Sequence, residues 1–162
     1  MTPLLLALAA LFAGAAGTLA LAAAPPWGTR VGVGGAVAGC GLGLVAALRV
    51  LLGTPAMPIH VAWQVPYGAF ALGLDPLSAF FLVPIFALSG LAALYGAEYL
   101  GERRDLRARI SWLFFDLLVA SMVVVVIARN GVLFLVAWEA MALASFFLVT
   151  LDDEDEIGRA HV

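Results

Sequence analysis

Long apolar runs separated by short polar segments dominate the sequence. Five runs approach or exceed the roughly 20 residues that an α-helix needs to cross about 30 Å of hydrocarbon. A membrane barrel would instead show a series of short alternating segments, and none is present. The pattern predicts an all-α membrane protein with spanning helices at about residues 3–24, 31–52, 76–99, 110–128 and 131–150. The first run is too long, and lacks the basic residues before it, for a secretory signal.

The segment between the second and third runs, residues 57–74, interrupts this helical pattern. Residues 59–65 alternate as a strand does, residues 66–68 (PYG) supply turn chemistry, and residues 69–73 return. The sequence therefore predicts a β-hairpin between the second and third helices.

The third helix has a recognisable start. Asp75 is a favourable N-cap residue, and Pro76 suits the first helical position, where the missing N–H costs nothing. The pair predicts that the helix begins at Pro76.

The second run carries Gly35, Gly39 and Gly43 at intervals of four, which places them in one ridge of a helix. Its sequence, VGVGGAVAGCGLG, has the glycine content of a nucleotide-binding loop, but no strand precedes it and the whole run has the length of a membrane span. We expect this ridge to pack closely against a neighbouring helix.

Composition agrees with a membrane protein: 64% of the 162 residues are hydrophobic and only 12% are charged, and the mean hydropathy is +1.08. The net charge of −3 comes largely from one acidic run, residues 152–156. The single cysteine, Cys40, can build neither a disulfide framework nor a cysteine-based metal site within the chain. No ligand set for an iron–sulfur cluster, haem or flavin is recognisable, so we expect no cofactor here.

Arginines between the runs predict the orientation, because basic residues favour the inner side of the membrane. With the N-terminus outside, the inner side receives Arg30, Arg103, Arg104, Arg107 and Arg109, whereas the outer side receives Arg129 and Arg49. We therefore expect a multi-pass protein of the inner or plasma membrane with its N-terminus and hairpin outside.

Two acidic residues, Asp116 and Glu139, lie well inside predicted spans. A carboxylate that faces lipid costs several kcal/mol at least, so such residues face a bundle interior or water and are candidates for function. The alternative is a structural carboxyl that stays protonated or hydrogen-bonds a neighbouring helix. This alternative is favoured for Asp116. A proton relay is favoured for Glu139, which is the main candidate for proton translocation, with Asp116 the second.

Depth separates the two acids. At 1.5 Å per residue, Glu139 lies about 12 Å from the outer end of its predicted helix, and Asp116 lies about 9 Å from the inner end of its own. Across a core of about 30 Å their levels would differ by about 9 Å, which argues against a pair of carboxyls that share a proton. An intramembrane protease is therefore not favoured.

The run FFDLLVASMVVVVIARNGVLFLVAWEAMALASFFLV, with LGLDPLSAFFL upstream, resembles the antiporter-like, proton-conducting membrane subunits of respiratory complex I. It is more similar still to the large membrane subunit of hydrogenase-4 and formate hydrogenlyase complexes. Large subunits of multisubunit sodium/proton antiporters are related to both. The resemblance covers about residues 70–150, and its most specific part is the W-E step at Trp138 and Glu139.

The resemblance implies that Glu139 is the fifth-helix glutamate that in this family pairs with a lysine on a later helix. It also implies an outward N-terminus and an outer hairpin. It gives Asp116 no role, since relatives are expected to carry asparagine or another polar residue there.

The chain departs from the family in length and in lysine content. Family members have around fourteen helices, whereas five are predicted here, and all eight basic residues of this chain are arginine. The last six residues, IGRAHV, match the translation of a common sequencing adapter. Residues 157–162 are therefore expected to be read-through, and His161 is given no metal-binding role.

The leading hypothesis is a truncated proton-translocating subunit of a redox-driven complex, such as a membrane-bound hydrogenase or an NADH:quinone oxidoreductase. Its partners would be other membrane subunits, and the transported ion would be H⁺ or Na⁺. The alternative is a small helical scaffold or assembly protein without transport activity, in which Glu139 is a buried hydrogen-bonding group.

Overall fold

The computed structural model describes residues 1–21, 25–63, 67–100 and 106–159, with the backbone alone for residues 25–26, 99–100 and 151–159. In these ranges it contains five helices long and apolar enough to cross a membrane. They are α1 (Thr2–Ala20), α2 (Pro25–Leu51), α3 (Pro76–Leu100), α4 (Leu106–Ile127) and α5 (Gly131–Arg159), with strands β1 (Ile59–Ala62) and β2 (Ala69–Leu72) between α2 and α3. The predicted all-α membrane fold with an interposed hairpin is confirmed.

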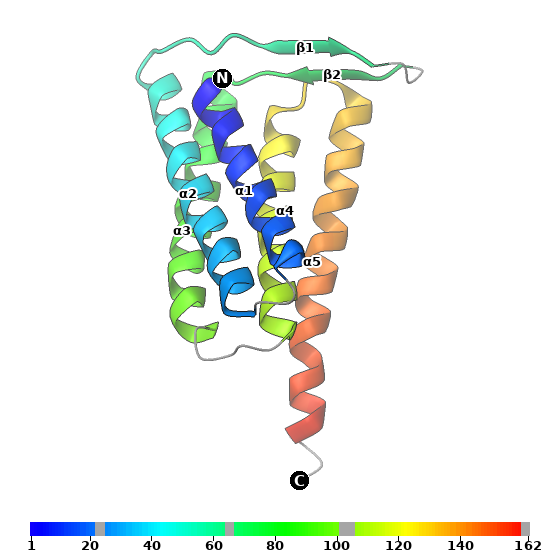
Figure 1. Ribbon diagram of the computed structural model, residues 1–162. Coiled ribbons are helices and arrows are strands. Elements are labelled where there is room, and N and C mark those ends of the chain that lie inside the picture. The colour runs from blue at the N-terminus through cyan, green and yellow to red at the C-terminus, as the bar shows by residue number, and fades with distance from the viewer. Residues whose placement is uncertain (22–24, 64–66, 101–105, 160–162) are drawn as a thin grey trace.

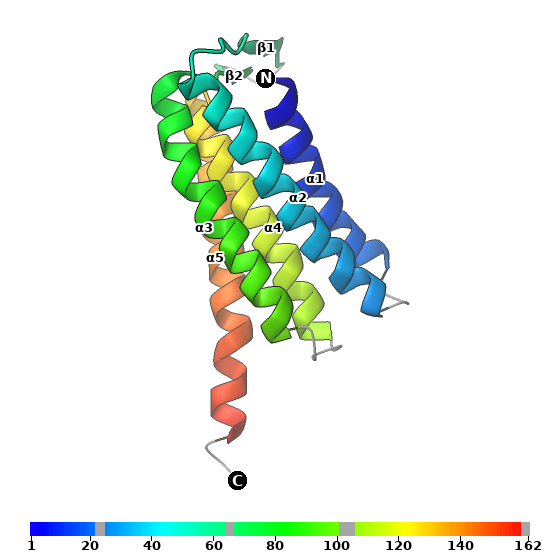
Figure 2. The ribbon, with the colours of Figure 1, turned by 90° about the vertical axis from the view of Figure 1, so that its left-hand side faces the viewer.

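The helices run alternately up and down, so the N-terminus lies at the hairpin end of the bundle and α5 ends at the opposite end (Figure 1). We call the latter the arginine-rich end, because Arg30, Arg107 and Arg109 lie there, near the start of α2 and the start of α4. Helix α4 is central: it contacts all four other helices, and none of its residues from 107 to 127 is exposed. Helix α5 packs on α4 and the hairpin. It lies at the right-hand edge of the bundle in Figure 1 and passes behind α3 in Figure 2.

The helix boundaries differ from the predicted ones by four residues or more at four ends. Helix α1 ends at Ala20, whereas the prediction extended to residue 24. Helix α2 begins six residues earlier than predicted, because Pro25 and Pro26 fit a first helical turn. Helix α4 begins four residues earlier, since arginine is a good helix former outside hydrocarbon as well. Helix α5 continues through the acidic run to Arg159, although only Gly131–Thr150 has the composition of a span. The predicted read-through, residues 157–162, lies outside the described residues from position 160 onward.

The glycine ridge of α2 lies at two helix contacts, as predicted. A Cβ on Gly35 would lie 2.6 Å from the Cα of Gly14 in α1, and one on Gly39 would lie 2.6 Å from Leu11. A Cβ on Gly43 would overlap the ring of Phe86 in α3. The absence of side chains along this ridge therefore lets α1 and α3 approach α2 closely.

The hairpin is antiparallel, with Ile59 opposite Leu72 and Ala62 opposite Ala69. Its strands are shorter than predicted, four residues each. Of the predicted turn, residues 66–68, position 66 lies outside the described residues. Backbone bonds tie β2 to the end of α4: Gly73 N–H donates to the Ile127 carbonyl at 2.9 Å, and Arg129 N–H donates to that of Ala71 at 2.8 Å.

Asp75 caps α3 as predicted and also joins it to the end of α4. Its Oδ1 accepts the Ser78 N–H at 2.7 Å, and its Oδ2 lies 2.8 Å from Arg129 Nη2. The same Arg129 nitrogen donates to the Ser78 hydroxyl and the Gly73 carbonyl. One guanidinium thus links the start of α3, the end of the hairpin and the α4–α5 connection.

The hydrogen bond from the Ser78 backbone, together with the Arg129 charge, lowers the pKa of Asp75 below its ordinary value of 3.8. A lowered folded-state pKa stabilises the fold above pH 3.8, and this stabilisation is lost as the pH falls through the lowered pKa. Both side chains are more than 40% exposed, so solvent screening keeps the contribution of the ion pair small.

We expect Asp75→Ala to destabilise the protein by about 1 kcal/mol at pH 7, because it removes the N-cap acceptor of α3. Asp75→Asn keeps an acceptor and loses only the charge, so its effect should be smaller and should disappear at a pH below the lowered pKa of Asp75. The measurement is the apparent Tm of the purified protein at several pH values. An Asp75→Asn deficit that persists unchanged in acid would contradict the ion-pair contribution.

Candidate functional site

Glu139 lies on the side of α5 that faces away from the other helices. The residues of α5 that bury against the bundle are Leu133, Ala137 and Ala144. At about 100° per residue, Glu139 is on nearly the opposite face from Ala137. Its side chain is exposed in the described structure. Of the two environments expected for Glu139, a bundle interior or water, these five helices therefore do not provide the first.

The surface around Glu139 is apolar. Leu135, Trp138, Leu143 and Phe146 are all about half exposed or more, and Ala142 lies one turn away from Glu139 on the same side. Glu139 is eight residues from the start of α5, which is about 12 Å into the span. A carboxyl group at this depth would face hydrocarbon if nothing covered it.

Asp116 occupies the opposite kind of environment. Its side chain is 0% exposed, and a Cβ on Gly14 of α1 would lie 2.5 Å from its Oδ2. Gly14 in turn packs against Gly35 of α2. Asp116 therefore points from α4 into the junction with α1 and α2, where glycines leave room for it.

The early start of α4 changes the depth of Asp116. It lies ten residues after Leu106 and eleven before Ile127, so it is about 15 Å from either end and near mid-membrane. Measured from the hairpin end, the levels of Asp116 and Glu139 differ by about 5 Å rather than the predicted 9 Å. The two side chains point to different sides of the α4–α5 pair. They cannot share a proton because they point apart, although their depths in the membrane are similar.

Sequence reasoning missed a line of polar residues on the buried face of α4. Arg109, Trp112 and Asp116 follow one another at helical spacing, and all three are buried. A Cβ on Gly28 would lie 3.2 Å from Arg109 Cδ, and one on Gly32 would lie 2.8 Å from Trp112 Cβ. The i, i+3, i+7 spacing of these residues was the signal that could have identified this face.

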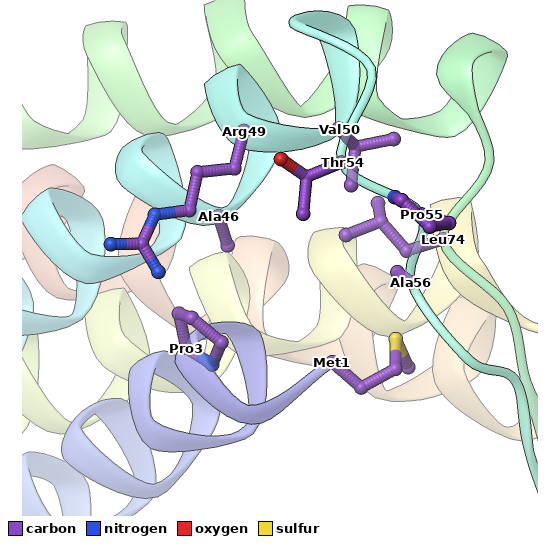
Figure 3. Close-up of a pocket in the computed structure, with 9 residues that line it drawn as sticks. All are labelled: Met1, Pro3, Ala46, Arg49, Val50, Thr54, Pro55, Ala56 and Leu74. Carbon is purple, nitrogen blue, oxygen red and sulfur yellow. The ribbon is translucent and has the colours of Figure 1, made fainter.

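A small cavity of about 80 Å³ lies at the hairpin end between the start of α1 and the end of α2. Figure 3 shows the Arg49 side chain extending over Pro3 at its edge, away from Leu74 and Ala56. Neither a carboxyl group nor a histidine lines it. It is also distant in the fold from Asp116 and Glu139, so we assign it no part in the site.

Comparison with known proteins places the chain. No family model matches it. It is 37% identical over 131 residues to an uncharacterized protein of Mycobacterium tuberculosis, and the match covers 80% of this chain and 19% of that protein. It is 34% identical over 131 residues to NADH-quinone oxidoreductase subunit L of the same organism, covering 76% of this chain and 20% of the relative. Hydrogenase-4 component B of Escherichia coli is 34% identical over 83 residues, or 51% of this chain and 12% of the relative.

The chain belongs to the family of antiporter-like membrane subunits. It spans about a fifth of the length of the first two relatives. In this antiporter-like chain the W-E step that carries the resemblance lies on the face of α5 that points away from the other helices. There Trp138 is 51% exposed beside Glu139.

Proposed function

We propose that this chain is part of a proton-translocating subunit in a redox-driven membrane complex, and that Glu139 is its proton relay. The observation that supports the proposal most directly is a mid-span carboxyl group on the apolar, exposed face of α5. Burying an ionisable group in hydrocarbon without a partner is unfavourable, so this face requires a protein or water-filled neighbour. A carboxyl at such an interface can take up and release a proton as its neighbour moves or changes charge.

The names of the relatives support a redox-driven complex. Their names assign them to an NADH-quinone oxidoreductase and to a hydrogenase-4, and we propose that this chain likewise assembles with other membrane subunits. Proton transport by the present chain would then be driven by electron transfer in partner subunits. We propose H⁺ as the transported ion, because a single carboxyl group can take up and release a proton; Na⁺ is the alternative.

Glu139→Gln tests the relay, because glutamine keeps the size and much of the hydrogen bonding of a protonated glutamate but cannot titrate. We expect proton uptake to fall at least tenfold in inverted vesicles that contain the assembled complex. Uptake is normalised to the amount of complex and to its electron-transfer rate. Tenfold corresponds to about 1.4 kcal/mol in the rate-limiting step.

Glu98→Gln is the matched control, because Glu98 is exposed near the end of the α3 span and undergoes the same chemical change. It should pump normally. Normal pumping by Glu139→Gln, at normal assembly, would refute the relay and favour the alternative of a scaffold without transport activity.

The orientation is a separate part of the proposal. We infer that the hairpin end faces outward and the arginine-rich end inward, because basic residues favour the inner side. A single cysteine in place of Arg104, in a chain without Cys40, should resist an impermeant thiol reagent in intact cells and react after permeabilisation. A cysteine in place of the exposed Met57, beside the hairpin, should show the reverse. Labelling of the Arg104 position in intact cells would show that the orientation is the opposite of the one proposed.

A further inference from the structure

We propose that Asp116 is a second proton-binding site, built into the α1–α2–α4 junction and separate from Glu139. It would bind a proton at neutral pH and exchange it with water. The proposal does not depend on the role of Glu139. It starts from the environment of the Asp116 carboxyl group.

Neither oxygen of Asp116 has a hydrogen-bond partner among the described residues, although the side chain is completely buried. Of the two structural alternatives weighed from the sequence, a hydrogen bond to a neighbouring helix is therefore not seen among the described residues. The other, a carboxyl that simply stays protonated, differs from the proposed site in that its proton would not exchange. Buried polar atoms in proteins are almost always satisfied, and an unsatisfied one indicates a bound water, an ion or a functional group. The two oxygens therefore indicate a ligand.

The shape of the junction shows that this position is built for the carboxyl group. Gly14 and Gly35 leave no side chain between α1 and α2 where Asp116 points, and a Cβ on Gly14 would lie 2.5 Å from Oδ2. Trp112, one turn from Asp116 on α4, extends its ring toward α3, where a Cβ on Gly96 would lie 3.4 Å from Trp112 Cη2. The indole therefore points toward α3, whereas the carboxyl group points toward α1 and α2.

The charges around the site are few. Described helix α1 carries no ionisable side chain, and the Cys40 thiol of α2 lies within electrostatic range of Asp116. Among the side chains that the structure describes, the other ionisable groups on the helices that contact α4 are Arg30 and Arg49 on α2, Tyr95 and Glu98 on α3, and Glu139 on α5, with Arg107 and Arg109 on α4 itself. None of these has a hydrogen bond or ion pair to the Asp116 oxygens.

A proton fits this site better than a metal cation does. Hard cations need several oxygen ligands, whereas the described residues contain no group of three or more acidic, histidine or cysteine side chains that could hold a metal ion, and neither Asp116 oxygen has a polar partner among them. An unpaired carboxylate in such surroundings is strongly disfavoured relative to the neutral acid. The exchange is a simple proton transfer: the carboxylate accepts a proton from hydronium to give the acid and water, and the reverse step returns it.

Infrared spectroscopy of the full-length protein, purified and reconstituted in lipid, tests the proposal. At pH 7 the spectrum of the wild type minus that of Asp116→Asn should contain the C=O band of a protonated carboxyl group. This band should shift in D₂O and remain in Glu139→Gln. Absence of the band, or a band that does not exchange in D₂O, would overturn the proposal. Since Glu139→Gln leaves the band, failure of the Glu139 relay is distinguishable.

A pair of glycine variants covers the case in which Asp116→Asn does not fold. In protein labelled with ¹³C-aspartate, Gly14→Ala should move the protonated aspartate band, because the new methyl group would displace the carboxyl. Gly41→Ala is the matched control, since nothing lies within 4 Å of its added Cβ, and it should leave the band in place. A wild type without a labelled protonated band at pH 7, or a band unaffected by Gly14→Ala, would refute the site.

Discussion

The cost of a carboxyl group in hydrocarbon is the constraint on which the arrangement of this protein depends. Water cannot satisfy polar groups in the membrane interior, so each must find a partner inside protein or a hydrated space. The chain meets this constraint in two ways. Asp116 is enclosed by three helices, whereas Glu139 lies on a face that the described helices leave uncovered.

Close packing through glycine makes the first solution possible. Gly14 and Gly35 bring the backbones of α1 and α2 together and leave space into which α4 can direct a polar side chain. Nearer the start of α2, Gly28 and Gly32 leave space for Arg109 and Trp112 in the same way. The central helix therefore carries polar residues on its most buried face without separating the helices around it.

The sequence was sufficient for the features that depend on local chemistry. Apolar length predicted the five spans, and the Asp75–Pro76 pair predicted the start of α3, because a cap needs only neighbouring residues. It could not predict where α4 begins, since arginines that end a hydrophobic run do not end a helix.

The local sequence pattern could not predict the directions in which the two candidate carboxyl groups point either. A helix that is apolar on all sides has no amphipathic signal to show which face contacts its neighbours. Consequently the sequence placed Asp116 nearer one membrane surface and left the direction of Glu139 open between a bundle interior and water. The structure instead puts Asp116 at mid-span in the core and Glu139 at the edge.

The central claim is that the Glu139 face of α5 is an interface rather than a lipid-exposed surface. A spin label in place of Ala142, one turn from Glu139 on the exposed side of α5, tests it in native membranes that contain the assembled complex. A spin-labelled phospholipid at the same depth is the reference for lipid exposure. The account predicts oxygen collision rates at position 142 several-fold below that reference. Rates equal to those of the lipid would show that α5 presents Glu139 to hydrocarbon, and would contradict the account.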